Sequence, residues 1–198
     1  EMKRVIGAIE SLHSNFPEAI ISIDTYYSGV AAAAVAAGAS LINDISGGQP
    51  DMFAVVAAWK VPYVLTHIKG TPATMQKHTQ YEDVTREVLD YFIEKVAACR
   101  AAGIRDIIID PGFGFAKTQA HNFTLLKNLS AFSMHDLPIL VGVSRKSTIY
   151  KTLGITAGEA LNGTTVLNTI GLMNGAHIIR VHDVKEAREA ITLVTHIK

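Results

Sequence analysis

The chain has 198 residues, and its 18 Lys plus Arg residues balance 18 Asp plus Glu residues for a formal net charge of zero. Hydrophobic residues make up 48% of the sequence and charged residues only 18%, which excludes an intrinsically disordered chain and allows a substantial buried core. The even charge balance argues against a nucleic-acid-binding protein, because phosphate contacts need a net basic face.

Short apolar, β-branched segments alternate along the chain with longer helical segments. The predicted strands are residues 19–24, 40–45, 63–67, 106–110, 138–143 and 177–182. The predicted helices are residues 28–38, 51–59, 82–103, 121–130, 145–173 (as two helices) and 184–196. The strands are nearly continuous apolar runs, as expected for strands that are covered on both faces. Gly38, Gly103 and Gly175 stand before three of them, where the C-terminal glycine of a helix belongs.

Six repeats of a strand followed by a helix predict an α/β fold with a parallel sheet. The sheet is either open and doubly wound or closed as a TIM (β/α)8 barrel, which typically has about 250 residues. The chain opens within a helical pattern that places Val5, Ile6, Ile9 and Leu12 on one face. We therefore expect one domain, residues 1–198, built as an N-terminally incomplete barrel with about six of the eight strand–helix units.

Neither a membrane span nor a secretion signal is expected from the sequence. The longest apolar run, residues 30–37, is too short to cross a bilayer, and no signal peptide opens the chain. The single cysteine, Cys99, cannot form an internal disulfide bond, which is typical of a reducing compartment. We expect a cytoplasmic protein in which Cys99 is a small buried residue.

Polar or charged residues stand at the carboxyl end of every predicted strand. They include Asp24, Asn43, Asp44, His67, Asp110, Ser144, Arg145, Lys146, Arg180, His182 and Asp183. Taken singly, several have ordinary explanations, and Asp44 and Asp183 are the best candidates for simple helix N-caps. Because the active site of a barrel is built at the carboxyl ends of its strands, the joint pattern predicts a site there.

The chemistry of these residues suits a flat heterocycle that carries several N–H groups. Asp24, Asn43 and Asp110 offer two carboxylates and an amide, which would pair with an amidine-like edge as carboxylates pair with guanidinium. Arg180 can stack on an aromatic ring or bind an anion, and His182 points to the same side of its strand. The sequence has no dinucleotide fingerprint, no P-loop and no His/Cys cluster with zinc spacing.

Six motifs together are similar to those of one enzyme family. They are residues 22–26 (SIDTY), 42–45 (INDI), 74–76 (TMQ), 110–115 (DPGFGF), 142–146 (GVSRK) and 180–184 (RVHDV). With these motifs in this order, the chain resembles dihydropteroate synthase over essentially its whole length. The resemblance implies a (β/α)8 barrel and a transferase of folate biosynthesis, which condenses 6-hydroxymethyl-7,8-dihydropterin pyrophosphate with 4-aminobenzoate to dihydropteroate and pyrophosphate. It also implies a cytoplasmic homodimer that uses Mg2+ and is a sulfonamide target.

The resemblance implies a role for each matching position. The residues implied for the pterin are Asp24, Asn43, Ile45, Asp110, Phe115, Gly142, Lys146 and Arg180. The residues implied for the pyrophosphate are Arg180 and His182, and those on the aminobenzoate side are Ser144 and Lys146. In the implied dissociative substitution, pyrophosphate departs first and the arylamine attacks the cation left on the methylene group. The family's magnesium-binding asparagine has no counterpart in these 198 residues, so we expect no metal ligand in this chain.

The chain departs from the family pattern at two places. The family's Met-His-Met after the third strand is residues 66–68 here, with the sequence Thr-His-Ile, which changes one wall of the implied pterin pocket. The family's Gly-Lys after the fourth strand is Ala116-Lys117, which is a milder change.

Three alternative functions remain open. A pterin-binding methyltransferase barrel would share residues like Asn43 and Asp110 but would not need Arg180 and His182 as a phosphate clamp. An aldolase would use Lys146 to form a Schiff base with a carbonyl substrate. A non-catalytic fragment would bind pterin without full turnover.

Overall fold

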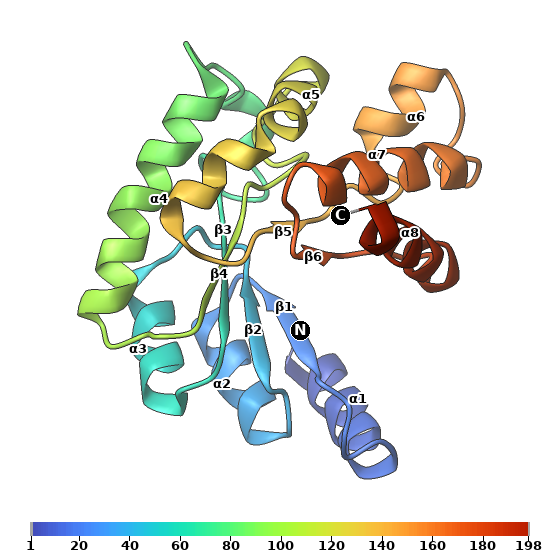
Figure 1. Ribbon diagram of the computed structural model, residues 1–198. Coiled ribbons are helices and arrows are strands. Elements are labelled where there is room, and N and C mark those ends of the chain that lie inside the picture. Colours follow the sequence, from blue (N-terminus) through green and yellow to red (C-terminus); the bar gives the residue numbers. More distant parts are fainter. Residues whose placement is uncertain (1, 198) are drawn as a thin grey trace.

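The computed structural model describes residues 2–197, so the outermost residues of the predicted 1–198 domain, Glu1 and Lys198, lie outside the described residues. Its strands are β1 (Ser22–Thr25), β2 (Leu41–Asp44), β3 (Tyr63–Thr66), β4 (Ile107–Asp110), β5 (Leu140–Val141) and β6 (Ile178–Ile179). The first four form one parallel sheet in sequence order, and β5 and β6 form a parallel pair. A bridge between Ile109 and Ile139 joins the two groups. This arrangement confirms the predicted α/β architecture of a parallel barrel (Figure 1).

The helices follow the strands in the predicted order. They are α1 (Met2–Asn15), α2 (Ser28–Ala36), α3 (Pro50–Trp59), α4 (Val84–Ala101), α5 (Gln119–Lys127), α6 (Ser147–Leu153), α7 (Leu161–Met173) and α8 (Val184–Ile197), with short 3-10 helices η1 (Met75–Lys77) and η2 (Leu129–His135). The segment 145–173 is divided into α6 and α7, as predicted. Gly38, Gly103 and Gly175 have φ angles of 117°, 89° and 104°, so glycine ends α2, α4 and α7 in a backbone conformation that other residues disfavour.

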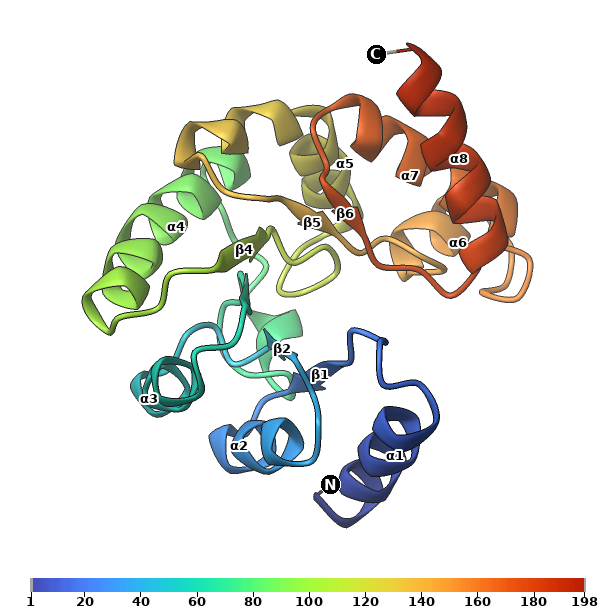
Figure 2. The ribbon, with the colours of Figure 1, turned by 60° about the horizontal axis from the view of Figure 1, so that its bottom comes forward.

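The strands curve into an arc with the helices on its outer side (Figure 2). Among residues 2–197, β1 is hydrogen-bonded to β2 alone and β6 to β5 alone. Apolar groups lie exposed near both ends of the arc, since Ile20 beside β1 is 84% exposed and Ile178 on β6 is 37% exposed.

Strand register decides which side chains face the inside of the arc. Asp24 pairs with Asn43, Asn43 with Val64, and Thr66 with Asp110, so these side chains project from the same face of the sheet. The alternate side chains pack toward the helices and include the fully buried Ile42, Leu65 and Ile109. Each such burial contributes about 1.5–3 kcal/mol. The outer face therefore holds the helices, while the inner face carries polar groups at the carboxyl ends of the strands.

Three features of the helices bear on the sequence analysis. Cys99 is fully buried on α4, as predicted. Leu12, on the apolar face of α1, is 47% exposed, because α1 packs mainly against α2 and buries only Ile9. Within residues 2–197, no helix is both long enough and apolar enough to cross a membrane.

Candidate active site

One hydrogen-bonded network joins the carboxyl ends of β1, β2 and β4 to the residue that follows β6. Asn43 Nδ2 donates to Asp24 Oδ2 at 2.9 Å. Arg180 Nη1 donates to Asn43 Oδ1 at 2.9 Å, and Arg180 Nη2 donates to Asp110 Oδ2 at 2.9 Å. Asn43 and Arg180 are 137 residues apart in the sequence. The fold thus brings together four of the residues that the sequence predicted for a pterin site.

The guanidinium of Arg180 occupies the centre of this network. The Asp110 side chain beneath it is 1% exposed, whereas the Arg180 side chain is 35% exposed. The other carboxylate oxygen of Asp110 accepts from the backbone N–H of Gly112 at 2.8 Å. Gly142 leaves the space that Arg180 needs, because a Cβ there would lie 2.7 Å from Nη2. The predicted wall position Gly142 therefore has a steric reason to be glycine.

Asp24 is a carboxyl group with a perturbed pKa at the edge of the network. Burial raises the pKa of Asp24 above its ordinary value, and the nearby carboxylate of Asp110 adds to the rise. Arg180, Lys146 and the amide of Asn43 act in the opposite direction.

Lys146 reaches the network from the start of α6. Its Nζ donates to the backbone carbonyl of Phe113 at 2.5 Å and lies 5.2 Å from the centroid of the Phe115 ring. Burial lowers the pKa of Lys146 to about 8, and the positive charge of Arg180 adds to this, although Asp110 and Asp24 favour the charged form. This half-buried lysine, with two carboxylates nearby, suits an anionic or carbonyl-bearing ligand.

A hollow of about 250 Å³ opens above this network. It is lined by Asp24, Gly142, Ser144, Lys146, Arg180, Val181 and His182. Ser144 Oγ and His182 Nδ1 lie 2.8 Å apart, and the backbone N–H of His182 also donates to Ser144 Oγ at 3.2 Å. The cationic and N–H groups on this side of the hollow are suited to an anion such as phosphate.

Two predicted pterin residues lie at the margin of this arrangement. Phe115 is half-buried beside Lys146. Ile45 is half-buried just after β2, where its backbone N–H donates to the carbonyl of Thr25 at 3.2 Å, and it does not line the hollow. The roles of both residues remain predictions.

Asp44 and Asp183 anchor loops with their side chains. The prediction that Asp44 caps a helix is wrong, since it accepts hydrogen bonds from the N–H groups of Ser46 and Gly48 and from the hydroxyl of Tyr63. The Asp183 carboxylate receives two hydrogen bonds from the guanidinium of Arg145, at 2.9 and 2.8 Å. Both carboxylates hold the backbone beside the site in place.

Sequence reasoning named Arg145 and Lys117 but did not predict the partners that make them anchors of the site. Arg145 binds Asp183 and also donates to the carbonyls of residues 157 and 158, so it fixes the loops after β5 and β6 against each other. Lys117 is buried and its Nζ lies 2.8 Å from Nδ1 of His67, at the end of β3. Neither pairing leaves a local signal in the sequence, because the partners are 38 and 50 residues apart.

The donor set of the hollow does not fit a magnesium site. Within the described part of the chain, no group of three or more His, Cys, Asp or Glu residues could hold a metal ion. The groups on the anion side of the hollow are Arg180, His182 and Lys146, whereas Mg2+ prefers carboxylate and other oxygen ligands.

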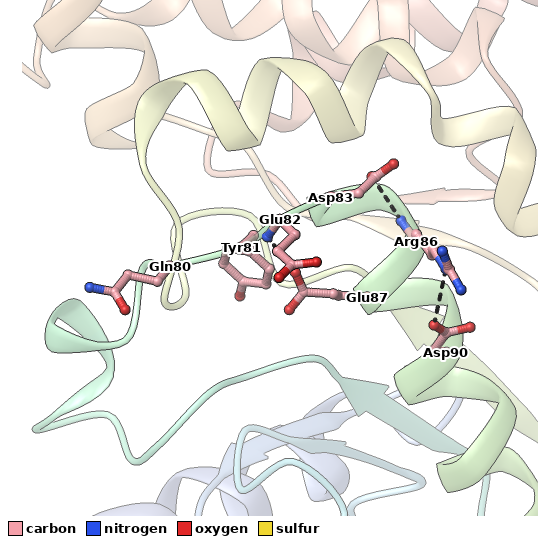
Figure 3. Close-up of a pocket in the computed structure, with 7 residues that line it drawn as sticks. All are labelled: Gln80, Tyr81, Glu82, Asp83, Arg86, Glu87 and Asp90. Atoms are coloured by element: carbon pink, nitrogen blue, oxygen red, sulfur yellow. Dashed lines mark hydrogen bonds and ion pairs between the residues drawn. The ribbon is translucent and has the colours of Figure 1, made fainter.

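A second hollow, of about 590 Å³, lies at the start of α4 and away from this network (Figure 3). Three of its acidic residues, Asp83, Glu87 and Asp90, have partners within the protein. Asp83 caps α4 by accepting from the N–H groups of Thr85 and Arg86, and Glu87 binds Lys69 at 2.6 Å. These contacts stabilise the start of α4, so the second hollow gives no reason to place an active site there.

Comparisons with known proteins give the family. Residues 1–182 match the model of the pterin-binding enzymes. The Escherichia coli dihydropteroate synthase is 44% identical over 98% of this chain and 70% of its own length. The structure of the Yersinia pestis dihydropteroate synthase in a sulfonamide drug complex aligns with a TM-score of 0.95 at 38% identity, covering 99% of this chain and 72% of that one.

Structures of the Thermus thermophilus dihydropteroate synthase are similar as well. The complex with 4-aminobenzoate has a TM-score of 0.95 at 33% identity, covering 100% of this chain and 77% of that one. The complex with 6HMPPP has a TM-score of 0.94 at 34% identity, covering 99% of this chain and 78% of that one. The sequence motifs, the parallel barrel strands and these relatives agree, and the chain belongs to the dihydropteroate synthase family, transferases of folate biosynthesis.

Proposed function

We propose that this chain binds a dihydropterin pyrophosphate through the network of Asp24, Asn43 and Asp110 and directs its methylene carbon toward 4-aminobenzoate. The observation that carries this proposal is the guanidinium of Arg180, whose two Nη atoms donate to Asn43 and Asp110 at 2.9 Å each. The amino group and ring N–H at one edge of a pterin have the same planar donor geometry as a guanidinium. The acceptors that hold Arg180 are therefore suited to hold that edge.

In this proposal, the side chain of Arg180 moves to a second position when the pterin binds. Once the pterin edge pairs with Asn43 and Asp110, the guanidinium is free to lie on the face of the ring or to bind the phosphates. His182 and Arg180 both line the hollow, and we assign the pyrophosphate to them. Gly142, Phe115 and Ile45 complete the proposed surroundings of the pterin.

The proposed reaction is a dissociative substitution at the methylene carbon. The bond between this carbon and the pyrophosphate oxygen breaks, and its electron pair leaves with the pyrophosphate. Asp24 and Asp110 stabilise the cation that remains on the pterin, while Arg180 and His182 stabilise the departing anion. The nitrogen of 4-aminobenzoate then bonds to the methylene carbon and loses a proton to water or to the released pyrophosphate. We place the aminobenzoate beside Ser144 and Lys146, where the ammonium group is available to its carboxylate.

Magnesium is implied by the family resemblance, but the described residues do not provide its ligands. A magnesium ion would need oxygen ligands other than the groups of this hollow, and we derive no step of the reaction through it. Whether pterin pyrophosphate binding to this chain depends on Mg2+ is tested by titration with and without EDTA.

We further propose a single domain that works as a homodimer in the cytoplasm. Val166, Ile170 and Met173 recur along one side of α7 and are 49%, 39% and 46% exposed, a spacing that places an apolar stripe on the surface. Light scattering at micromolar concentration tests the dimer, and Ile170→Glu should shift the protein toward the monomer. The buried, unpaired Cys99 suits a reducing compartment.

The test of the proposed function is calorimetric titration of the 198-residue chain with 6-hydroxymethylpterin pyrophosphate, beside Asp110→Asn and Asp106→Asn. Asp110→Asn removes a buried charge that faces the ligand, and loss of one charged hydrogen bond, about 1.5–3 kcal/mol, should weaken binding by about 10- to 100-fold. Asp106 lies exposed just before β4, so Asp106→Asn should bind like the parent chain. Binding that is equal in all three proteins, or absent from a folded parent chain, would contradict the proposal.

A further inference from the structure

A buried amine lies beneath the loop that joins β4 to α5. The side chain of Lys117 runs inward, and the residue is 5% exposed. Its Nζ donates to the carbonyl of Gly112 at 3.1 Å and to the carbonyl of Phe115 at 3.0 Å, and lies 2.8 Å from His67 Nδ1. One atom therefore ties two points of the loop to the end of β3.

These contacts satisfy Lys117 in either protonation state. A protonated amine can donate to both carbonyls and to His67 Nδ1, whereas a neutral amine can donate to the two carbonyls and accept from an Nδ1–H tautomer of His67. Because a buried polar group without partners is costly, this complete set holds the amine, and with it the loop, in one place.

The loop that Lys117 holds has a strained path. Gly112, Gly114 and Ala116 have φ angles of 71°, 83° and 51°, so every second residue is left-handed and one of them is not glycine. A Cβ at Gly112 would lie 2.1 Å from the carbonyl oxygen of His67, which shows how closely the loop approaches β3. Glycine adopts this conformation readily, whereas a non-glycine residue such as Ala116 costs about 1–3 kcal/mol there and persists where surrounding contacts hold it.

The same loop carries the groups that meet Lys146. The carbonyl of Phe113 accepts from Lys146 Nζ, the ring of Phe115 lies beside the ammonium, and Gly114 packs against the side chain of Lys146, since a Cβ there would lie 3.4 Å from its Cδ. Lys117 and Lys146 thus hold the loop from opposite sides, one from within the protein and one from the site.

We propose that Lys117 is a positioning residue for the reaction: by tying Gly112 and Phe115 to the end of β3, it fixes the loop that places Lys146 and Phe115 in the pterin site. This role rests on the proposed function, because it concerns the placement of the substrate-binding lysine. Lys117 itself touches no substrate.

A double-mutant cycle distinguishes positioning from plain structural support. Pterin pyrophosphate affinity is measured by calorimetry for the parent chain, Lys117→Met, Lys146→Met and the double variant. We expect Lys117→Met to weaken binding about 10-fold, and the double variant to bind no more than about 2-fold weaker than Lys146→Met. Lys127→Met is the matched control, because Lys127 lies exposed on α5 and should have no effect. The proposal would be overturned if the loss of affinity in the double variant equalled the product of the losses in Lys117→Met and Lys146→Met. It would also be overturned if Lys117→Met bound the ligand like the parent chain.

Amide hydrogen exchange without ligand gives an independent readout. We expect the N–H groups of Gly112 and Gly114, which donate to Asp110 and Asn122, to exchange at least 10-fold faster in Lys117→Met, while the amides of α4 stay unchanged. Lys117→Gln, which keeps two donors, is measured in parallel so that the result does not depend on the folding of one variant. Unchanged loop exchange in a folded variant would overturn the role of Lys117. A folded parent chain that binds no pterin pyrophosphate would instead remove the proposed function, and the positioning role with it, even if loop exchange responds as expected.

Discussion

Replacing Arg180 with methionine is expected to separate recognition of the pterin ring from recognition of its pyrophosphate. In the structure, the guanidinium of Arg180 donates to the acceptors on Asn43 and Asp110 that we assign to the pterin. A pterin must displace the guanidinium before it can pair with these groups. Methionine keeps an apolar side chain of similar length and removes the competitor.

The size of the effect follows from the two hydrogen bonds. The bond to Asp110 involves two charges and would contribute about 1.5–3 kcal/mol, and the bond to Asn43 about 1 kcal/mol. We take the lower figure for the first bond, because the Arg180 side chain is 35% exposed and solvent screens its charge. The two hydrogen bonds together contribute about 2.5 kcal/mol. Part of this gain is offset in Arg180→Met, because the pterin ring loses a cation on which it could stack, a contact that contributes about 1 kcal/mol. A net gain of about 1.4 kcal/mol would raise the affinity for a phosphate-free pterin about 10-fold.

The assay is calorimetric titration with two ligands, 6-hydroxymethylpterin and its pyrophosphate ester. Arg180→Met should bind the first about 10-fold more tightly than the parent chain and the second at least about 10-fold more weakly, because the phosphates lose a charged partner. His182→Gln is the matched control: it should weaken only the pyrophosphate ester. Equal weakening of both ligands by Arg180→Met would refute the reasoning, since it would mean that Arg180 does not compete with the ring.

Three further outcomes follow from the structure. Gly142→Ala should lower the midpoint of thermal unfolding, because the new Cβ would lie 2.7 Å from Arg180 Nη2 in the position that donates to Asn43 and Asp110; an unchanged midpoint would contradict this. Lys60→Gly should raise the free energy of unfolding by about 0.5–1 kcal/mol in urea, because Lys60 ends α3 with a φ of 53°, whereas Lys60→Ala should give no gain. Burial lowers the pKa of Lys117 from 10.5 to about 7, although Asp110 opposes the shift. Between about pH 7 and 10.5 the unfolded chain therefore binds a proton on Lys117 that the folded chain does not bind. The free energy of unfolding of the parent chain, relative to that of Lys117→Met, should therefore fall by up to about 1.4 kcal/mol per pH unit as the pH drops from about 10 to 7. Below about pH 7 this difference should stay constant. A difference that is constant over the whole range would contradict the lowered pKa and show that the amine remains charged.

The order of strands and helices could be predicted because each buried strand is a continuous apolar run and is followed by a segment with a helical pattern. The lengths of β5 and β6 could not be predicted in the same way. Both were expected to span six residues, but each has two hydrogen-bonded ladder residues. An apolar run indicates that a segment is buried, whereas a hydrogen-bonded ladder also needs a neighbouring strand along its whole length. Among the described residues, β6 has only β5 beside it.

The core of the site was predictable for a related reason. Asp24, Asn43 and Asp110 each lie in the last two residues of a parallel strand. Parallel strands bring their carboxyl ends to one edge of the barrel, so the meeting of these residues follows from topology. The anchors Arg145 and Lys117 were not predictable, since each depends on the path of a loop that returns to a partner far away in the sequence.

A crystal structure of this chain with bound 6-hydroxymethylpterin would test the account most directly. We predict that the amino edge of the pterin lies against Asn43 and Asp110, with the guanidinium of Arg180 displaced from both. A pterin bound elsewhere, with Arg180 still donating to Asn43 and Asp110, would contradict the assignment of these residues as the pterin site.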